Sequence, residues 1–449
     1  MEDTIAAIST TLGIGAISII RVSGADSISI VNNIFKGKDL LEVPTHTITY
    51  GHIIDNNNII DEVLVSIMRA PKSFTMEDVV EINCHGGIAT TKKVLELLLL
   101  NGCRLAEPGE FTKRAFLNGR IDLLEAEGVM DVLNAKTEKS RALAINQLSG
   151  KTSNMIEQLR QKIVEVLANI EVNIDYPEYQ DIDQMTNKDL ENKLIGIETD
   201  LEKILKNSEN GKLLKEGINV SIIGRPNVGK SSILNRLLEE DKAIVTDIEG
   251  TTRDIVEGTI QLDGLIINFI DTAGIRRTND VVESIGVKKS MDLIDKSDLV
   301  LFVLNNNEEL TEDDKIILEK LSDKNHIIVV NKMDLASKLD LSNQDNVVFV
   351  SALEDKNIGI LKDKIKEIYQ LEQIETDDLT YLTNARSISL VKEAKKAIND
   401  AKEGINNKVP IDMVEIDVKR AWDLLGEVIG KTYHEELINQ LFSQFCLGK

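Results

Sequence analysis

Residues 218–231 read INVSIIGRPNVGKS, an apolar run followed by a glycine-bearing turn. The run has the composition of a buried strand. The turn matches GxxxxGK(S/T), in which Gly224 and Gly229 let backbone N–H groups curl around a phosphate. In that pattern Lys230 neutralises phosphate oxygens and Ser231 binds Mg²⁺. A strand followed by this turn predicts a domain that binds a nucleotide through its phosphates.

Strand-like and helical segments alternate from residue 218 to residue 369. Such alternation predicts a Ras-like, doubly wound parallel sheet whose ligand lies at the carboxyl ends of the strands. The strand-like segments are INVSII, IQLDG, LIINFID, DLVLFVL, HIIVVNK and VVFVS, and a helix is expected from Ile358.

Two further motifs predict that the base is guanine. Asn331, Lys332 and Asp334 in NKMD follow a strand. The two carboxylate oxygens of Asp334 can accept hydrogen bonds from guanine N1–H and N2–H, and adenine lacks that pair of donors. GTP is therefore favoured over ATP. Ser351 and Ala352 follow the next strand, where backbone N–H groups can support guanine O6.

The remaining parts of the expected nucleotide site lie in two loops. Asp271 in DTAG can hold Mg²⁺ through water, while the N–H of Gly274 contacts the γ-phosphate. Thr252 in GTTRD is the candidate threonine that closes on Mg²⁺, which Ser231 also binds. In full, the expected GTP-binding residues are Asn227, Val228, Gly229, Lys230, Ser231, Ser232, Thr246, Asp247, Ile248, Glu249, Gly250, Thr251, Thr252, Asp271, Thr272, Ala273, Gly274, Asn331, Lys332, Asp334, Ser351 and Ala352.

The group that orients the hydrolytic water is expected to differ from that of Ras. Ras-type enzymes place a glutamine directly after DxxG, but this chain has Ile275 there. Glu283 in VVESIG is the candidate replacement, because a carboxylate can position and polarise water. A solvated glutamate at the start of a helix is the alternative. Lys230 is the second expected catalytic residue, through its charge on the phosphates.

The rest of the chain follows other patterns. With 449 residues, 42% of them hydrophobic and 28% charged, several folded domains are expected. Residues 1–118 alternate strand-like runs (AISIIRV, HTITYGHII, IIDEVLVSIM, DVVEINC) with helices and predict an α+β domain. Residues 119–216 and 371–449 show helical periodicity, so residues 217–370 are interpreted as a domain inserted into a discontinuous helical domain. The helical pattern is expected to break within residues 207–217, NSENGKLLKEG.

Charge and cysteine content limit the kinds of partner. The 52 basic and 75 acidic residues give a net charge of −23, which disfavours indiscriminate binding to nucleic acid or anionic lipid. The three cysteines, Cys84, Cys103 and Cys446, are widely spaced and indicate neither a disulfide framework nor a zinc site. No signal-peptide pattern and no run of about 20 apolar residues is evident, so a cytoplasmic protein without membrane contact is expected.

Motifs from both ends of the chain point to one family. They are DTIAAIST, GIGAISIIRVSG, APKSFTMEDVVEINCHGG, EPGEFTKRAFLNGRIDLLEAEGVMDVL, GRPNVGKSS, TDIEGTTRD and the terminal FSQFCLGK. Together, and in collinear order, they resemble the MnmE (TrmE) family of tRNA modification GTPases. The resemblance implies an N-terminal domain that binds tetrahydrofolate and dimerises, a discontinuous helical domain, and an inserted G domain.

The same resemblance implies a reaction and a partner. A homodimer would act with the flavoprotein MnmG, which carries the FAD, in a heterotetramer. It would install an aminomethyl or carboxymethylaminomethyl group at C5 of the wobble uridine of certain tRNAs. The one-carbon unit would come from 5,10-methylene-tetrahydrofolate, for which 5-formyl-tetrahydrofolate is an analogue.

A potassium ion in the place of an arginine finger is also implied by the resemblance. Asn227 in the phosphate-binding loop marks this ion, and Thr246, Ile248 and Thr251 are the matching ligand positions. A cation there would offset charge developing between the β- and γ-phosphates, and would promote pairing of two G domains. Asn227 acting only as a cap of its loop is the alternative.

Five residues match functional positions of the family outside the G domain. Arg21, Glu81, Arg120 and Lys449 correspond to folate contacts, and Cys446 to the cysteine of the C-terminal motif. Arginine and lysine suit the folate carboxylates, and a glutamate can accept hydrogen bonds from the pterin. Cys446 could act as a thiolate near the one-carbon unit. Solvated surface charges and a buried structural cysteine are the alternatives.

Two positions depart from the family pattern. Thr11 stands where proline is usual, and Met76 stands where glycine is usual. Both could alter the shape of loops beside the folate pocket.

Two other functions fit parts of the sequence. A ribosome-assembly GTPase would use the folate-type domain only as a platform, but the basic RNA-binding module typical of such proteins is not evident. A folate enzyme that GTP merely regulates is the other alternative.

Overall fold

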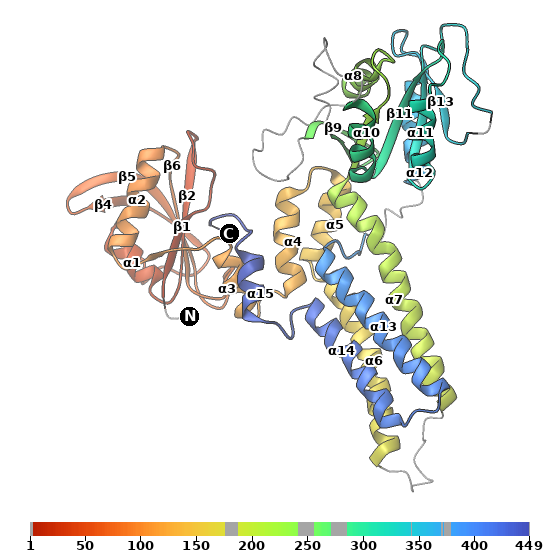
Figure 1. Ribbon diagram of the computed structural model, residues 1–449. Helices are drawn as coiled ribbons and strands as arrows, with labels where there is room; N and C mark the ends of the chain where they lie inside the picture. The colour runs from red at the N-terminus through yellow and green to blue at the C-terminus, as the bar shows by residue number, and fades with distance from the viewer. Residues whose placement is uncertain are drawn as a thin grey trace. The chain divides into compact units, whose positions relative to one another are not determined.

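The computed structural model describes residues 3–175, 187–240, 256–270, 285–342, 344–369, 371 and 379–448. The chain folds into two compact units. Unit 1 comprises residues 1–130, 147–200 and 389–449, and unit 2 comprises residues 131–146 and 201–388. Figure 1 traces the elements of both units along the chain.

A seven-stranded sheet forms the N-terminal part of unit 1. Its strand order is β3-β4-β5-β6-β2-β1-β7, and neighbours are antiparallel except for the parallel pair β1 and β7. The four strands expected from the sequence are confirmed as β2 (Ile17–Ser23), β4 (Thr47–Asp55), β5 (Asn58–Met68) and β6 (Val79–His85). The structure adds three strands that were not expected, β1 (Ile5–Ile8), β3 (Phe35–Gly37) and β7 (Arg104–Leu105).

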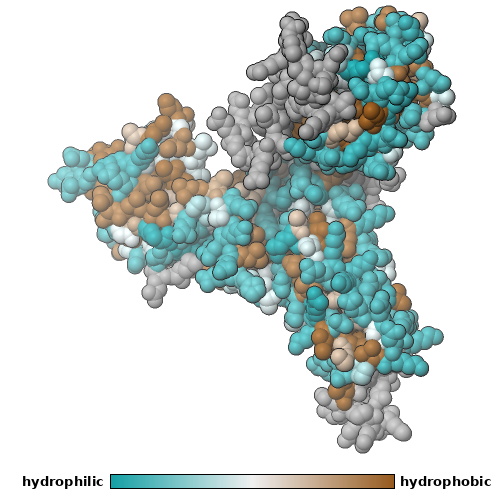
Figure 2. Space-filling model, in the orientation of Figure 1, coloured by the Kyte–Doolittle hydropathy of each residue, from teal (hydrophilic) through white to brown (hydrophobic). Residues whose placement is uncertain are grey.

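Strict alternation along the central strands gives this sheet two different faces. One face is buried beneath α1 (Ser27–Asn33) and α2 (Ile88–Leu100), which share one apolar core with it. The opposite face, here called the outer sheet face, carries Ile17, Ile48, Tyr50 and Leu64, which are between 46% and 67% exposed. In Figure 2 hydrophobic residues gather on this N-terminal part, whereas the helices of unit 1 present mainly hydrophilic ones.

Helices from the two halves of the predicted helical domain pack together in unit 1. Apolar residues of α6 (Lys151–Asp175) are buried at helical spacing, and so are those of α14 (Ile411–Val428). The helices that precede or follow the two sheet-containing segments are α3 (Glu110–Leu117), α4 (Leu123–Asn134), α5 (Glu138–Leu148), α6 (Lys151–Asp175), α7 (Asn187–Glu216), α13 (Ala385–Asn406), α14 (Ile411–Val428) and α15 (Glu435–Phe442). Most of α5 and residues 201–216 of α7 belong to unit 2. Among the helices that the structure describes, none is both long enough and apolar enough to cross a bilayer.

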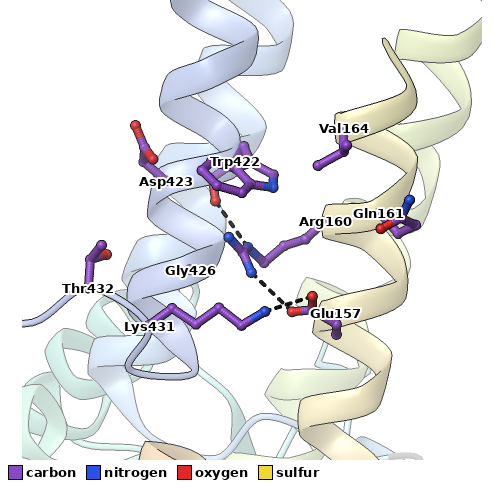
Figure 3. Close-up of a pocket in the computed structure, with 9 residues that line it drawn as sticks. All are labelled: Glu157, Arg160, Gln161, Val164, Trp422, Asp423, Gly426, Lys431 and Thr432. Carbon is purple, nitrogen blue, oxygen red and sulfur yellow. Dashed lines mark hydrogen bonds and ion pairs between the residues drawn. The ribbon is translucent and has the colours of Figure 1, made fainter. Parts of the chain in front are cut away.

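Arg160 on α6 contacts α14 through its guanidinium group. Its guanidinium carbon lies 4.4 Å from the ring centre of Trp422, and its Nε donates to the Trp422 carbonyl oxygen at 3.3 Å. Arg160 Nη1 donates to Glu157 at 3.0 Å, and Glu157 also accepts from Lys431 at 2.7 Å. Figure 3 shows these groups around a pocket of about 430 Å³. Arg160 is buried, so these bonds form part of the packing between the two helices.

Unit 2 contains the predicted doubly wound sheet. Its strand order is β13-β12-β11-β8-β10-β9, parallel except for the antiparallel edge pair β9 and β10. The strands are β8 (Ile218–Ile223), β9 (Val256–Leu262), β10 (Leu265–Ile270), β11 (Leu299–Asn305), β12 (His326–Asn331) and β13 (Val347–Phe349).

Helices cover both faces of this sheet. Along β11, Leu299, Leu301 and Val303 belong to one apolar cluster, and Val300 and Phe302 belong to another. Helices α8 (Lys230–Glu240) and α12 (Ile358–Ile368) contribute to the first cluster, and α10 (Ile285–Lys296) and α11 (Glu312–Leu321) to the second. Two apolar faces on a parallel strand are what the doubly wound fold requires.

One prediction from the helical pattern is only partly right. The helix does not break at residues 207–216, because α7 runs continuously to Glu216 and ends only at Gly217, whose φ is +76°. Gly211 lies inside this helix, where a Cβ would lie 2.8 Å from Tyr381 Cβ and 2.9 Å from the Leu382 carbonyl oxygen. The glycine therefore permits a close approach and does not end the helix. The domain boundaries after residues 118, 216 and 370 remain predictions.

Candidate functional site

The glycine-bearing turn follows β8 at its carboxyl end. Gly224 and Gly229 have φ angles of +142° and +102°, and Asn227 adopts +63°. A Cβ at Gly229 would lie 2.0 Å from Asn331 Nδ2. The loop can keep this path only with glycine at that position, which leaves its backbone open to a ligand.

Lys230 begins α8 and points back along the loop. Its Nζ donates to the carbonyl oxygens of Gly224 and Arg225, both at 2.7 Å. Burial lowers the pKa of Lys230 to about 8. A phosphate beside this ammonium would favour its charged form and oppose the effect of burial. The loop thus holds a partly desolvated cation that an anionic ligand would stabilise.

Asn331 ties the phosphate-binding loop to the predicted base-binding loops. Its Nδ2 donates to the Val228 carbonyl oxygen at 2.9 Å, and its Oδ1 accepts from the Ala352 N–H at 3.1 Å. Lys332 Nζ donates to the Asn227 carbonyl oxygen at 3.0 Å. Three separated motifs therefore lie side by side at the ends of β8, β12 and β13.

Asp334 is held by a neighbouring loop. Its Oδ1 accepts from Ser351 Oγ at 2.7 Å, and this bond lowers the pKa of the Asp334 carboxyl. An exposed, ionised carboxylate can accept hydrogen bonds from a guanine edge. Arg236 on α8, which sequence reasoning missed, donates from Nε to the Ala352 carbonyl oxygen at 3.0 Å. No motif signals this arginine, because it contacts the loop only after folding.

Part of the predicted nucleotide site lies outside the described residues. Ser231 and Ser232 follow Lys230 in the first turn of α8. The predicted residues without a described position are Thr246, Asp247, Ile248, Glu249, Gly250, Thr251, Thr252, Asp271, Thr272, Ala273, Gly274 and the catalytic candidate Glu283.

The N-terminal sheet brings together residues that are far apart in the sequence. Arg21 on β2 lies opposite Glu81 on β6, and Arg21 Nε donates to Glu81 Oε1 at 2.9 Å. The Arg21 guanidinium carbon lies 5.9 Å from the ring centre of Phe74 and 5.7 Å from that of Phe111. Arg120 lies 5.0 Å from the same Phe74 ring. Three of the four predicted folate contacts thus form one group, here called the Arg21 cluster.

The C-terminal tail lies against the N-terminal part of unit 1. The Gly109 N–H donates to the Cys446 carbonyl oxygen at 3.3 Å, and Ser9 Oγ donates to the Gly448 carbonyl oxygen at 3.3 Å. Gly109 directly precedes α3, the helix that carries Phe111. Cys446 is exposed, unlike the buried structural cysteine considered as its alternative. Lys449 lies outside the described residues.

A buried ionic network supports the loop that carries Phe74. Arg114 is fully buried and donates to Asp3 at 2.9 Å, to Glu110 at 3.0 Å and to Glu77 at 3.1 Å. Glu77 also accepts from Ser23 Oγ at 2.7 Å. Sequence reasoning missed this network, although Glu110 and Arg114 stand four residues apart on one helix face.

The fold and the nucleotide-binding loops define a P-loop protein of the G-domain class. The family model of the MnmE helical domain matches residues 123–446, a range that includes the G domain, and that of the GTP-binding protein TrmE N-terminus matches residues 4–120. The tRNA modification GTPase MnmE of Bacillus cytotoxicus is 55% identical over 455 residues, covering 100% of this chain and 99% of the relative. The MnmE of Bacillus cereus gives the same identity and coverage.

The chain belongs to the MnmE family of tRNA modification GTPases. It is accordingly a GTP hydrolase with a G domain, and its family acts in tRNA modification. Among solved structures, the G domain of the FeoB iron transporter of T. maritima is 26% identical with a TM-score of 0.25, covering 34% of this chain and 99% of that one.

Proposed function

We propose that this chain couples GTP hydrolysis to the addition of an aminomethyl or carboxymethylaminomethyl group at C5 of the wobble uridine of certain tRNAs. It would do so in the cytoplasm, with the flavoprotein MnmG as partner in a heterotetramer. The one-carbon unit would come from 5,10-methylene-tetrahydrofolate bound at the Arg21 cluster. The observation that carries this proposal is the Arg21–Glu81 pair beside Phe74.

The chemistry of the Arg21 cluster suits a folate. Glu81 can accept from the pterin amino and ring N–H groups, and Arg21 and Arg120 can donate to carboxylates. Phe74 and Phe111 supply aromatic surface against which a flat ring can pack. The side chains of Arg21 and Glu81 are 21% and 23% exposed, so a ligand can reach them. Cys446, an exposed thiol in the C-terminal tail, and Lys449 are proposed to complete the site.

In the nucleotide site, Lys230 is proposed to contact β- and γ-phosphate oxygens, with Ser231 and Thr252 on Mg²⁺. The magnesium, when bound, would neutralise charge on the phosphates. Asp334 is proposed to read guanine, and Glu283 to position water. Replacing Glu283 by Ala should then lower turnover far more than GTP affinity, and a parallel loss of GTP binding would indicate a structural role instead.

A potassium ion at Asn227 is the next element of the proposal. Within the described residues no hydrogen bond of the Asn227 carboxamide is found, so its side chain is not used to cap the loop there. Thr246, Ile248 and Thr251 would supply the other ligands. GTP turnover should be faster in potassium than in sodium, and Asn227→Ala should remove the difference. Equal wild-type rates in both salts would exclude this role.

The outer sheet face supports a homodimer. Ile17, Ile48, Tyr50 and Leu64 form an exposed apolar surface, and such surfaces commonly mark interfaces. Leu64→Glu should convert the dimer into monomers in light-scattering measurements. Leu100→Glu is the matched control, because Leu100 is 73% exposed at the end of α2, away from this face. A dimer that persists in Leu64→Glu would place the interface elsewhere.

The whole proposal is tested on tRNA from a deletion strain. Wild-type protein should restore the wobble-uridine side chain, measured by nucleoside mass spectrometry. Glu81→Gln should fail to restore it while keeping GTP turnover, because the change removes a pterin acceptor and leaves the G domain untouched. Unchanged nucleosides in the deletion strain would defeat the proposal.

A further inference from the structure

A hollow in the N-terminal part of unit 1 adjoins the Arg21 cluster. It measures about 460 Å³ and shares Phe74 and Arg120 with that cluster. Lys72 and His46 add further basic groups, and none of the lining residues is acidic. Such a lining is unusual in a chain with a net charge of −23 and indicates an anionic ligand. Its full lining is His46, Met68, Pro71, Lys72, Ser73, Phe74, Met76 and Arg120.

The positive charge of this hollow is not neutralised from within the loop. Lys72 is exposed and has no ion pair among the residues that the structure describes. Arg120 donates to the Phe74 carbonyl oxygen at 3.3 Å. The nearby carboxylate of Glu77 is engaged by Arg114 and Ser23. The carboxylate of Glu125 also interacts electrostatically with Arg120. The charge of Lys72 therefore remains fully available to a ligand, and that of Arg120 in part.

The loop that forms the hollow is held in place before any ligand arrives. The Ala70 N–H donates to Asp78 Oδ1 at 2.8 Å, and Ser73 Oγ donates to the Glu77 carbonyl oxygen at 2.5 Å. Asn118 Nδ2 donates to the Thr75 carbonyl oxygen at 2.7 Å. A loop braced in this way loses little conformational entropy when a ligand binds.

We propose that this hollow binds the oligo-γ-glutamyl tail of a folate whose pterin lies at the Arg21–Glu81 pair. The inference rests on the proposed folate function and specifies its substrate as the polyglutamylated form. Each added glutamyl unit brings one carboxylate toward Lys72 and Arg120, and its methylene groups can pack on Phe74 and Met76. A nucleic-acid backbone fits less well, because it would need an extended basic groove.

The test compares two ligands on the full-length protein. Calorimetry would measure the Kd of monoglutamyl and pentaglutamyl 5-formyl-tetrahydrofolate at low and high salt. The pentaglutamyl form should bind about three- to tenfold more tightly at low salt, and the preference should shrink as salt rises. Lys72→Glu should abolish the preference while leaving the monoglutamyl Kd nearly unchanged.

Lys92→Glu is the matched control, since Lys92 is an exposed lysine on α2 that does not line the hollow. It should keep the wild-type preference. Equal Kd values for the two ligands in wild type would overturn the inference while the folate proposal stood. Failure of both ligands to bind would overturn the folate proposal itself. A drop in tRNA affinity, with the folate preference intact, in Lys72→Glu would assign the basic groups to nucleic acid and also overturn the inference.

Discussion

The nucleotide site of unit 2 and the Arg21 cluster of unit 1 are assembled in different ways. The nucleotide site is built from short motifs, each of which directly follows a parallel strand. Because the carboxyl ends of parallel strands meet at one edge of the sheet, these motifs lie together there. The second depends on antiparallel register: Arg21 and Glu81 are 60 residues apart and meet because β2 and β6 pair. A motif reveals the first kind of site, whereas the second becomes visible only when strand pairing is known.

The largest expected effect concerns the support of the Arg21 cluster. Arg114→Ala should lower the free energy of unfolding of unit 1 by about 3–5 kcal/mol, because it removes the fully buried guanidinium that pairs with Asp3, Glu77 and Glu110. Among the described residues, Asp3 and Glu110 then keep only the partly exposed Arg104 as a cationic partner. Urea unfolding measures the change. Lys162→Ala, a control in the same unit, removes an exposed pair with Asp200 and should cost less than about 1 kcal/mol. Similar losses in both variants would contradict the buried network.

A substitution in the nucleotide site should lower the rate of GTP hydrolysis more than it lowers the stability of the fold. Lys230→Ala should lower the kcat for GTP by about 10²–10³-fold, because a charge that stabilises the transition state is lost. Steady-state phosphate release measures it. Lys315→Ala, which removes an exposed ion pair with Glu312, should leave kcat unchanged. A loss of folate affinity in Lys230→Ala would show that the two sites are not independent.

Much of the fold could be predicted from the sequence, and the reasons are local. Alternation at period two predicted β2, β4, β5 and β6, and the alternation of strand-like with helical segments predicted the doubly wound sheet. The helix break expected from residue 207 onward occurs only at Gly217, because Gly211 lies inside α7 and serves a contact with Tyr381 that no local pattern encodes. The bracing role of Asn331 and the contact of Arg236 with Ala352 likewise depend on segments that meet only in the folded chain.

A smaller effect concerns how the stability of the nucleotide-free protein depends on pH through Lys230. The folded pKa of Lys230 is about 8 against an ordinary 10.5, so the unfolded chain binds more protons between these values. Stability of the nucleotide-free protein should therefore rise with pH across that window. Lys230→Met should be more stable than wild type by up to about 3 kcal/mol at pH 7, and the gap should close toward pH 10.5. Thermal unfolding measured across this range tests the sign, and a gap that widens would refute it.

The smallest expected effect lies at the edge of the Arg21 cluster. Met76 has a φ of +62°, a left-handed conformation that glycine adopts without strain. Met76→Gly should stabilise the protein by about 0.5–1 kcal/mol. This gain is smaller than the strain energy that the substitution relieves, because glycine also raises the conformational entropy of the unfolded chain. Met68→Gly, in the regular strand β5, should destabilise it. Thermal unfolding of both variants measures the difference. If both variants were destabilised, the backbone conformation of Met76 would not be strained in the folded protein.

The contact between Arg160 and Trp422 has a spectroscopic consequence. Trp422 is the one tryptophan of the sequence, and a guanidinium lies over its ring. Intrinsic tryptophan emission therefore reports on the α6–α14 contact alone, while the two sheets contribute none. Separation of these helices would expose the indole to water and shift its emission to longer wavelength, so the bundle can be followed in the intact, unlabelled protein while GTP is hydrolysed elsewhere in the chain.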